Sequence, residues 1–351
     1  MKKINLKKPV LVTGGSGYLA SWIVKRLLDE GMTVHATVRD ISDKTKYAHL
    51  NSLADQSSGQ LKVFSADLLQ EGSFDAAMEG CELICHTASP FLLDNPKDPE
   101  NDLIKPARQG TENVLGSAGR QASVKRVVLT SSIAAIFGDS ADIALTKNNI
   151  FTEEHWNTTS SVSHQAYCYS KTLAEKVAWS MVENQAQWDL VVINPGWILG
   201  PSLTQRTDSA SIKTMIEFGN GTFKSGVPDL RFGMVDVRDV ALAHIRAGLT
   251  PEAKGRHIIV SQSASLMDIA DILKKQYGKT YPFPRRVAPK WFFWLMAPFF
   301  GRTRKYVARN IGFPMALDNT KSRKALKLDY QPFEQTVRDH FQQLVDDKLI
   351  I

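Results

Sequence analysis

The sequence contains few cysteines and no recognisable export signal. Its three cysteines, Cys81, Cys85 and Cys168, form neither a Cys-x-x-Cys pair nor an even set. This pattern argues against a disulfide framework and is typical of a reducing compartment. The lysine-rich start leads directly into the strand-like PVLVT, so we expect no signal peptide. These absences together predict a cytoplasmic protein.

Long hydrophobic runs are also missing. The most apolar late segment, WFFWLMAPFF at residues 291–300, is about half as long as a helix that crosses a bilayer. We therefore expect no transmembrane segment. We predict that residues 291–300 form a buried helix or the lip of a pocket, and contact with a membrane surface is the alternative.

Internal repeats, low-complexity segments and nucleic-acid-binding motifs are absent as well. The net charge is +7, but its cations gather in the N-terminal MKKINLKK and in the late FGRTRKYVAR. Solvated surfaces explain such clusters without a nucleic-acid partner. The chain has 351 residues, 43% of them hydrophobic, which is enough for about two domains. We expect a monomer or homodimer that binds a small molecule and has no metal site.

Short β-branched runs alternate with helix-period segments through the first part of the chain. One such helix, over residues 18–31, lies between the first two runs and ends at Gly31. The alternation predicts an α/β fold, a Rossmann-type doubly wound parallel sheet with helices on both faces. We expect its strands at residues 9–13, 33–39, 61–67, 82–89, 126–132 and 189–196.

The pattern changes after Pro201, where a long stretch has no clear strand. Helices are predicted over residues 235–249 and 265–278, with a short strand at 255–260 between them. We therefore divide the chain into a Rossmann domain, residues 1–200, and a smaller, mostly helical substrate-binding lobe, residues 201–351. Strands and helices of the second part can return to the main sheet.

The segment TGGSGYLA, residues 13–20, lies where the first strand ends and the first helix begins. Gly14 permits a tight turn, Gly17 lets the backbone approach a pyrophosphate, and Ala20 is small enough for close packing. A plain tight turn is the alternative, but the strand before and the helix after it favour a dinucleotide site. The predicted cofactor contacts in this segment are Gly14, Ser16, Gly17, Tyr18 and Leu19.

The end of the second strand favours NADP(H) over NAD(H). An acid at this position would bind a ribose 2′-hydroxyl, whereas an arginine accepts a 2′-phosphate. TVRD supplies Arg39, and Lys44 and Lys46 follow closely. Two other interpretations stay open, a ribose contact from Asp40 and Arg39 as a plain surface cation. Asp67, at the end of the third strand, is a candidate for binding the adenine amino group or for capping the next segment.

AYCYSK, residues 166–171, lies in a long helix predicted over residues 163–183. Tyr167 and Lys171 are four positions apart and share a face, while Tyr169 points elsewhere and is assigned to packing or the substrate edge. A lysine ammonium lowers the pKa of a nearby phenol, which suits proton transfer to a carbonyl as hydride arrives. The pair alone also fits a tyrosine ring packed on a lysine stem.

Ser131 and Ser132 end the strand RVVLTSS. The carboxyl ends of strands in this architecture meet at the cofactor crevice. A serine hydroxyl there can hold and polarise a substrate oxygen. Together the glycine turn, the strand-end serine and the Tyr-Lys helix indicate a carbonyl-reducing site.

The chain resembles the extended short-chain dehydrogenases/reductases, in the branch of dihydroflavonol reductases, cinnamoyl-CoA reductases and related bacterial and fungal carbonyl reductases. The resemblance implies that Tyr167 is the proton donor, Lys171 its partner and Ser132 the hydroxyl that holds the carbonyl. Ser131 is less suited by its place in the TSS pattern, and Asn113 fits helix packing. Nearly the whole chain is covered, through TGGSGYLA, TVRD, ADLLQEGSFDAAMEGC, HTASPF, GTENVL, VVLTSS, YCYSKTLAE, NPGWILGP and VDVRDVALAH.

The resemblance also implies which residues meet NADP(H). Arg39 and Lys46 would meet the 2′-phosphate, and Asp67 and Leu68 the adenine. Residues 87–89 would lie at the ribose and phosphates, and residues 195–198 at the nicotinamide. The individual contacts implied in these two stretches are Thr87, Ala88, Ser89, Pro195 and Ile198.

The sequence departs from cinnamoyl-CoA reductases around the tyrosine, with QAYCYSK in place of NWYCYGK. This departure argues against a thioester and favours an aldehyde or ketone with an apolar or aromatic substituent. Phe91, Trp197 and part of residues 281–300 are candidates for the pocket wall, and packing in the core explains each equally well. Two other functions stay open, an NAD-dependent nucleotide-sugar epimerase or dehydratase, and a non-catalytic NADP-sensing regulator.

Overall fold

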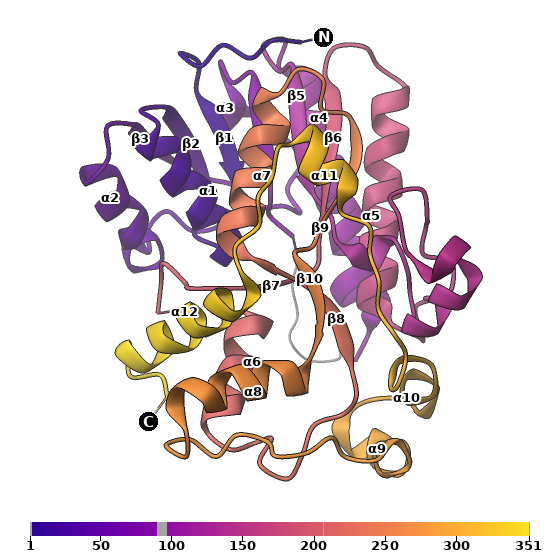
Figure 1. Cartoon of the computed structure of the whole chain (residues 1–351). Helices are drawn as coiled ribbons and strands as arrows, with labels where there is room; N and C mark the ends of the chain where they lie inside the picture. Colours follow the sequence, from indigo (N-terminus) through magenta and orange to yellow (C-terminus); the bar gives the residue numbers. More distant parts are fainter. Residues whose placement is uncertain (1, 90–96, 206, 351) are drawn as a thin grey trace.

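The computed structural model describes residues 2–89, 97–205 and 207–350. Within these ranges the main element is a parallel sheet of seven strands in the order β3-β2-β1-β4-β5-β6-β9 (Figure 1). The predicted Rossmann-type sheet is therefore confirmed. Its strands are β1 (Val10–Thr13), β2 (Thr33–Val38), β3 (Gln60–Ser65), β4 (Leu83–His86), β5 (Arg126–Thr130), β6 (Asp189–Pro195) and β9 (Gly255–Ile259).

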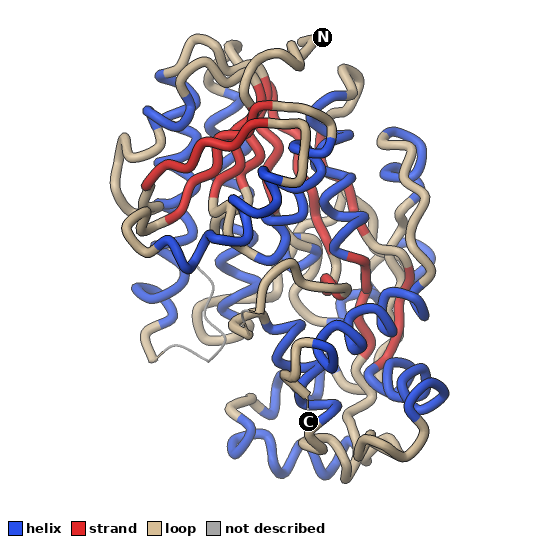
Figure 2. The backbone as a smooth tube through the Cα atoms, turned by 90° about the vertical axis from the view of Figure 1, so that its left-hand side faces the viewer, coloured by secondary structure: helices blue, strands red, loops and turns tan. Residues whose placement is uncertain are grey.

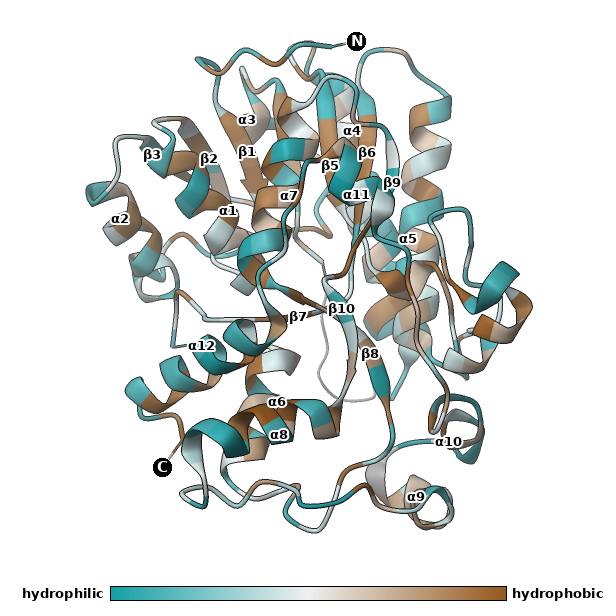
Figure 3. Cartoon of the chain, in the orientation of Figure 1, coloured by the Kyte–Doolittle hydropathy of each residue, from teal (hydrophilic) through white to brown (hydrophobic). Residues whose placement is uncertain are grey.

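Helices cover both faces of this sheet (Figure 2). Val10 and Val12 of β1 point into one apolar cluster, whereas Leu11 between them belongs to the cluster on the other face. This alternation is the period of two that a strand imposes on its side chains. The first face is covered by α1 (Tyr18–Asp29), α2 (Ala48–Asp55) and α7 (Val237–Leu249). The second face is covered by α3 (Asp75–Met78), α4 (Lys105–Arg120) and α5 (Ala166–Glu183). Figure 3 shows the strands of this sheet mostly in brown, as expected for strands buried on both faces.

A second sheet of three strands supports the lobe. β7 (Trp197–Leu199) is parallel to β8 (Arg231–Asp236), and β10 (Gln262–Ser265) is antiparallel to β8. The prediction missed β8 because its run, RFGMVD, carries no regular alternation of apolar and polar residues. The helices packed around this sheet are α6 (Ala210–Gly219), α8 (Leu266–Tyr277) and α12 (Phe333–Asp346).

Two parts of the C-terminal half return to the main sheet. β9 pairs with β6 at its edge, and α7 packs against α1 and over β4, β5 and β6. α11 (Thr320–Ala325) lies against β9. The chain therefore crosses between sheet and lobe more than once.

Most of residues 291–299 are exposed, so the prediction of a buried helix there is wrong. This segment contains α9 (Lys290–Met296), followed by a short 3₁₀ helix, Ala297–Phe300, and α10 (Arg304–Asn310). The side chain of Trp291 is 64% exposed and that of Phe299 is 81% exposed. The apolar composition of the segment suggested burial, but α9 contacts little beyond its two neighbouring helices. In the part of the chain that is described, no helix has the length and apolar character needed to span a bilayer.

Candidate active site

The glycine turn joins β1 to α1 with no room for side chains. Gly14 has φ +66°, the left-handed region that favours glycine, and an added Cβ would lie 3.1 Å from the Cβ of Ala88. At Gly17 an added Cβ would lie 3.2 Å from the carbonyl oxygen of Gly14. Gly15, which the sequence analysis did not single out, would bring a Cβ to 2.8 Å from that of Ala36 on β2. The turn is thus a bare backbone cradle at a helix start, a form that fits a pyrophosphate.

Tyr18, one of the predicted cofactor contacts, bridges the sheet and the lobe. Its hydroxyl donates to the carbonyl oxygen of Gly200 at 2.6 Å. Burial, followed by the nearby carboxylate of Asp236, raises its pKa well above the ordinary value. Tyr18 is therefore a neutral hydrogen-bond donor that holds the start of α1 against the strand leading into the lobe.

The ends of β1 and β4 are tied together beside this turn. The hydroxyl of Thr13 accepts from the amides of Thr87 and Ala88 at 3.1 and 3.0 Å and lies 3.0 Å from Nδ1 of His86. Burial, with a smaller effect from the charge of Lys171, lowers the pKa of His86 to about 3. His86 is therefore neutral, and these contacts hold the predicted ribose and phosphate segment in place.

At the end of β2, Arg39 and Asp40 have different environments. Arg39 is exposed directly after β2. The carboxylate of Asp40 accepts from the amide and the hydroxyl of Ser42 at 2.9 and 2.6 Å. Lys46 lies in the same loop and pairs with Asp43 at 3.1 Å. Because Asp40 is committed to its own turn, the geometry favours Arg39 as the group that meets a cofactor here.

Asp67 and Leu68 follow β3. The carboxylate of Asp67 accepts from the amide of Leu69 at 2.8 Å and so stabilises a turn after β3, where no helix begins for it to cap within these described residues. Asn113 of α4 donates to the carbonyl oxygen of Leu68 at 2.7 Å. Asn113 therefore packs α4 against this loop, and Leu68 lies beside the cleft.

Tyr167, Ser132 and Lys171 come together at the carboxyl end of β5. Tyr167 is hydrogen-bonded to Ser132, and the Nζ of Lys171 lies 5.9 Å from the centre of the Tyr167 ring. The same Nζ donates to the hydroxyl of Ser89 at 2.9 Å. The phenol, one of the two strand-end serines and the lysine thus share one site, in which Tyr167 is 37% exposed.

The protein shifts the pKa values of both ionisable groups of this site. Desolvation raises the pKa of Tyr167 to about 12, with a smaller increase from Cys168 and a decrease from the hydrogen bond with Ser132. Desolvation also lowers the pKa of Lys171 to about 8. The spacing of Tyr167 and Lys171 predicted a lowered pKa for the phenol. Burial raises the pKa of Tyr167 instead.

A narrow cleft opens beside Lys171. It extends from the ends of β4 and β5 toward α4 and the loop after β3. Its wall contains several predicted cofactor contacts together with residues of α4 and α5, among them Leu68, Ala88, Ser89, Gly110, Thr130 and Lys171. Four of the predicted contacts, Leu68, Ala88, Ser89 and Lys171, therefore line the same cleft.

Ser131 has a different environment from Ser132, and the sequence analysis missed the group that explains it. The hydroxyl of Ser131 donates to the buried carboxylate of Glu175. Asn194 donates to the same carboxylate at 2.8 Å and to the carbonyl oxygen of Ser132 at 3.1 Å. Nε of Arg256 completes a buried ion pair with Glu175 at 2.6 Å. Glu175 therefore fastens α5 to the strand ends that carry Ser132, and Ser131 is part of this support.

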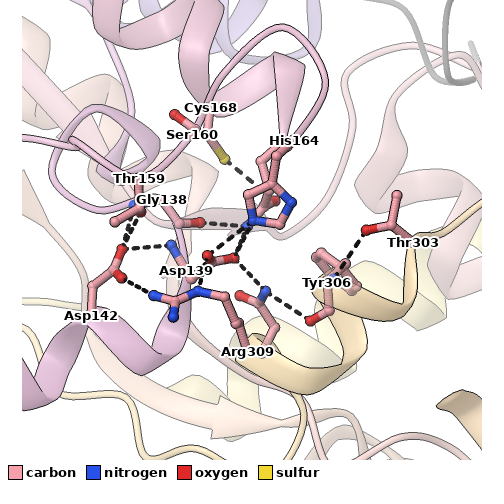
Figure 4. Close-up of polar contacts among 12 residues, drawn as sticks. Gly138, Asp139, Asp142, Thr159, Ser160, His164, Cys168, Thr303, Tyr306 and Arg309 are labelled. Carbon is pink, nitrogen blue, oxygen red and sulfur yellow. Dashed lines mark hydrogen bonds and ion pairs between the residues drawn. The ribbon is translucent and has the colours of Figure 1, made fainter.

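The first turn of α5 is held by a second buried carboxylate, Asp139 (Figure 4). It contacts His164 Nε2 at 3.0 Å, Arg309 Nε at 2.5 Å and Asn310 Nδ2 at 2.7 Å. Burial alone would raise the pKa of Asp139, but these hydrogen bonds hold it below the ordinary value. Gln165, in a left-handed conformation with φ 58°, also donates to Asp139 and starts α5 at the next residue. The cluster thus connects α10 of the lobe to the turn that carries Tyr167.

Three more of the predicted residues, Pro195, Trp197 and Ile198, lie where the chain leaves β6. Pro195 ends β6, and Ile198 lies in β7 opposite Val235. The ring of Trp197 packs edge-on against that of Phe232, with ring centres 5.1 Å apart. Packing in the core therefore accounts for at least part of the surroundings of Trp197. Phe91, predicted for the pocket wall, lies outside the described residues.

Comparison with known proteins gives relatives along the whole chain. Residues 11–261 match the 3-beta hydroxysteroid dehydrogenase/isomerase family. A cinnamoyl-CoA reductase of Medicago truncatula is 38% identical over 99% of both chains, and a dihydroflavonol 4-reductase of Gerbera hybrida is 35% identical over 78% of this chain and 73% of its own. Among solved structures, the yeast methylglyoxal/isovaleraldehyde reductase Gre2 complexed with NADPH is 28% identical, covers 98% of this chain and 100% of its own, and superposes with a TM-score of 0.78.

These matches carry the predicted resemblance from motifs to the full length of the chain. The matched relatives are oxidoreductases, and the aligned regions include the parallel sheet, the glycine turn and the Tyr-Lys helix of this chain. The chain belongs to the 3-beta hydroxysteroid dehydrogenase/isomerase family, in the dihydroflavonol reductase and cinnamoyl-CoA reductase-like branch of the extended short-chain dehydrogenases/reductases.

Proposed function

We propose that this protein reduces an aldehyde or ketone to an alcohol with NADPH. The observation that carries the proposal is the meeting of Tyr167, Ser132 and Lys171 at the carboxyl end of β5, where the phenol bonds to one hydroxyl and the lysine lies one helical turn away. The NADPH in the Gre2 structure supports the choice of cofactor. The few cysteines support a cytoplasmic location.

The residues present fit NADP(H). The bare glycine turn suits the pyrophosphate, and Arg39 with Lys46 suits the 2′-phosphate, because Asp40 is occupied by Ser42. The other contacts we propose are Asp67 and Leu68 for the adenine, Thr87, Ala88 and Ser89 for the ribose and phosphates, and Pro195 and Ile198 for the nicotinamide. When bound, NADPH supplies the hydride that reaches the carbonyl carbon.

Tyr167 is the proposed proton donor. Because its pKa is raised to about 12, its phenol is protonated at neutral pH and can give its proton to the carbonyl oxygen. The Ser132 hydroxyl holds that oxygen in place. Lys171, bonded to Ser89, orients the ribose and places a positive charge near the phenolate that remains.

The substrate we propose is an aldehyde or ketone with an apolar or aromatic substituent, bound between residues 1–200 and the lobe of residues 201–351. Gln165, which replaces the asparagine of the thioester reductases, donates to Asp139 and the carbonyl oxygen of Gly138. Ser170, which replaces a glycine, is buried and donates to the carbonyl oxygen of Tyr167. Both therefore serve the helix start, which supports a small carbonyl substrate over a thioester.

The two alternative functions have less support. A nucleotide-sugar epimerase with NAD would need a free acid at the end of β2, where Arg39 is exposed and Asp40 is occupied. A cofactor-sensing regulator would not need Tyr167, Ser132 and Lys171 in one site. The reductase is therefore the function that the geometry favours.

A matched pair of variants tests the proton donor. Tyr167→Phe is expected to lower kcat by about 10²–10⁴-fold and to leave NADPH binding unchanged. Tyr169→Phe removes the phenol hydroxyl of the tyrosine two positions further along α5 and is expected to keep most of the activity. Aldehydes and ketones are assayed by the loss of NADPH absorbance, with UDP-sugars as the control substrates. An active Tyr167→Phe enzyme beside an inactive Tyr169→Phe enzyme would contradict the assignment.

The cofactor is tested separately through kcat/KM for NADPH and NADH. We expect a preference for NADPH that Arg39→Ala reduces by about tenfold or more, because a charged hydrogen bond to phosphate is lost. A wild-type preference for NADH would overturn the argument from Arg39.

A further inference from the structure

An apolar surface projects from the lobe at α9 and the 3₁₀ helix that follows it. We call residues 290–299 the aromatic tip. None of the residues of α9 is fully buried. Its exposed large side chains, with their exposed fractions, are Trp291 (64%), Phe292 (39%), Trp294 (41%), Leu295 (49%) and Phe299 (81%). Contiguous apolar surface of this kind is uncommon on a protein that has no partner.

The fold holds this tip out rather than letting it collapse. Nζ of Lys290 donates to the carbonyl oxygens of Ala308 and Ile311 at 2.9 and 2.7 Å, which fixes the start of α9 to the end of α10. Ala297, Val307 and Ile311 form a small apolar cluster beneath it. The tip is therefore anchored from below, where Phe293 also packs, while Trp291, Trp294 and Phe299 remain exposed.

The charge around the tip has one sign. The sequence contains no aspartate or glutamate from residue 272 to residue 317. Arg302, Arg304 and Lys305, next to the tip, are all exposed. The guanidinium of Arg304 lies 4.4 Å from the centre of the Trp294 ring, so cation and indole share one surface. The cations of residues 279–309 are Lys279, Arg285, Arg286, Lys290, Arg302, Arg304, Lys305 and Arg309.

Three of these cations are already engaged, and one of them, Arg286, donates to the carbonyl oxygen of Ser225. Arg309 pairs with Asp139 and Asp142 inside the protein, and Lys290 bonds to backbone carbonyls. The exposed cations next to the tip, Arg302, Arg304 and Lys305, outnumber Asp229, an acid beside the segment whose carboxylate lies 3.9 Å from Arg231. Charge of one sign disfavours a symmetric contact between two copies of this surface, because the same cations would face one another. The tip instead suits a partner that is both apolar and anionic.

We propose that the aromatic tip docks on a bilayer surface that contains anionic phospholipid. Tryptophan and phenylalanine rings enter the boundary between headgroups and acyl chains, while arginine and lysine next to them meet the phosphates. The protein binds the membrane at one end without crossing it. Such docking would also bring the lobe close to carbonyl compounds dissolved in the membrane.

Vesicle co-sedimentation tests this docking independently of reductase activity. The wild-type protein is expected to bind vesicles of phosphatidylcholine with phosphatidylserine, to bind pure phosphatidylcholine vesicles much more weakly, and to be released by high salt. Trp291→Ala/Phe299→Ser is expected to reduce binding by about tenfold or more, since two exposed rings no longer insert. Arg302→Gln/Arg304→Gln is expected to reduce it by about 5-fold for each cation removed.

Controls at the far end of the molecule separate the tip from general effects. Leu6 is 53% exposed near the N-terminus, which lies opposite α9 in Figure 1. Leu6→Ala removes an exposed apolar side chain, Lys7→Gln/Lys8→Gln removes the same charge as Arg302→Gln/Arg304→Gln, and both variants are expected to bind like the wild type. Thermal melting checks that every variant is folded.

The proposal is wrong if the wild-type protein binds neither kind of vesicle. It is also wrong if Lys7→Gln/Lys8→Gln weakens binding as much as Arg302→Gln/Arg304→Gln, which would mean attraction by net charge alone. A change in oligomeric state for Trp291→Ala/Phe299→Ser, with vesicle binding intact, would identify the tip as a self-association surface and overturn the proposal as well.

Discussion

The buried ion pair between Glu175 and Arg256 gives the sharpest test of how the site is supported. Glu175 is 1% and Arg256 6% exposed, and the carboxylate accepts from Arg256, Asn194, Ser131 and the indole nitrogen of Trp179. Glu175→Gln keeps the shape of the side chain, but it removes the negative charge. It also places an amide NH₂ group against side chains that donate hydrogen bonds to the carboxylate. The variant leaves a buried guanidinium without its counter-charge, which costs about 3–5 kcal/mol.

That cost is a large fraction of the free energy of unfolding of a typical protein, about 5–15 kcal/mol. Urea unfolding of Glu175→Gln should therefore show a clearly lower midpoint. Arg256→Met alone should also destabilise, because it leaves the carboxylate buried and unpaired. The double variant should lose less than the sum of the two, with a coupling energy of about 1–3 kcal/mol.

Two results would refute this reasoning. If Glu175→Gln costs less than about 1 kcal/mol, the carboxylate is not the partner that compensates Arg256 in the interior. If the single effects simply add in the double variant, the two side chains do not depend on each other. Either result would leave the position of Ser132 without the support described above.

Three further outcomes follow from the site. Gly14→Ala should weaken NADPH binding and destabilise the protein by about 1–3 kcal/mol, because φ is +66° there and the new Cβ would meet Ala88; unchanged fluorescence titration and melting would contradict this. The rate of reduction should fall as pH rises through about 8, because the pKa of Lys171 is lowered to about 8 and the charged lysine is the active form. A rate that stays constant from neutral pH to about pH 10 would contradict this role of Lys171. Arg309→Met should raise the pKa of Asp139, because one of the hydrogen bonds that hold this pKa below its ordinary value is lost. The loss of stability relative to the wild type should therefore be large at neutral pH and shrink below about pH 4. An equal difference in melting temperature at neutral pH and below pH 4 would argue against the Arg309–Asp139 pair.

The sequence predicted the strands of the main sheet and the Tyr167–Lys171 pair because both rest on local periodicity. A strand repeats every two residues and a helix every 3.6, so a short window contains the whole signal. Gly14 was likewise readable, since a turn between strand and helix demands it. These features depend on neighbours in the chain.

The support of the site was not predictable in this way. Glu175 is separated from Ser131 by 44 positions and from Arg256 by 81, and nothing in either local segment marks the pair. The pKa of Tyr167 was misjudged for the same reason, because the surrounding walls come from distant segments. The aromatic tip was misread because apolar composition predicts burial only when another element is present to cover it.

The repeated crossing of the chain between sheet and lobe constrains how the protein is made. β9 and α7, which complete the main sheet and cover β4, β5 and β6, are synthesised only after β7, α6 and β8. A nascent chain that ends near residue 200 would therefore expose the apolar side of those strands and an unpaired edge at β6. The nucleotide-binding half and the lobe consequently have to complete their folding together, late in synthesis.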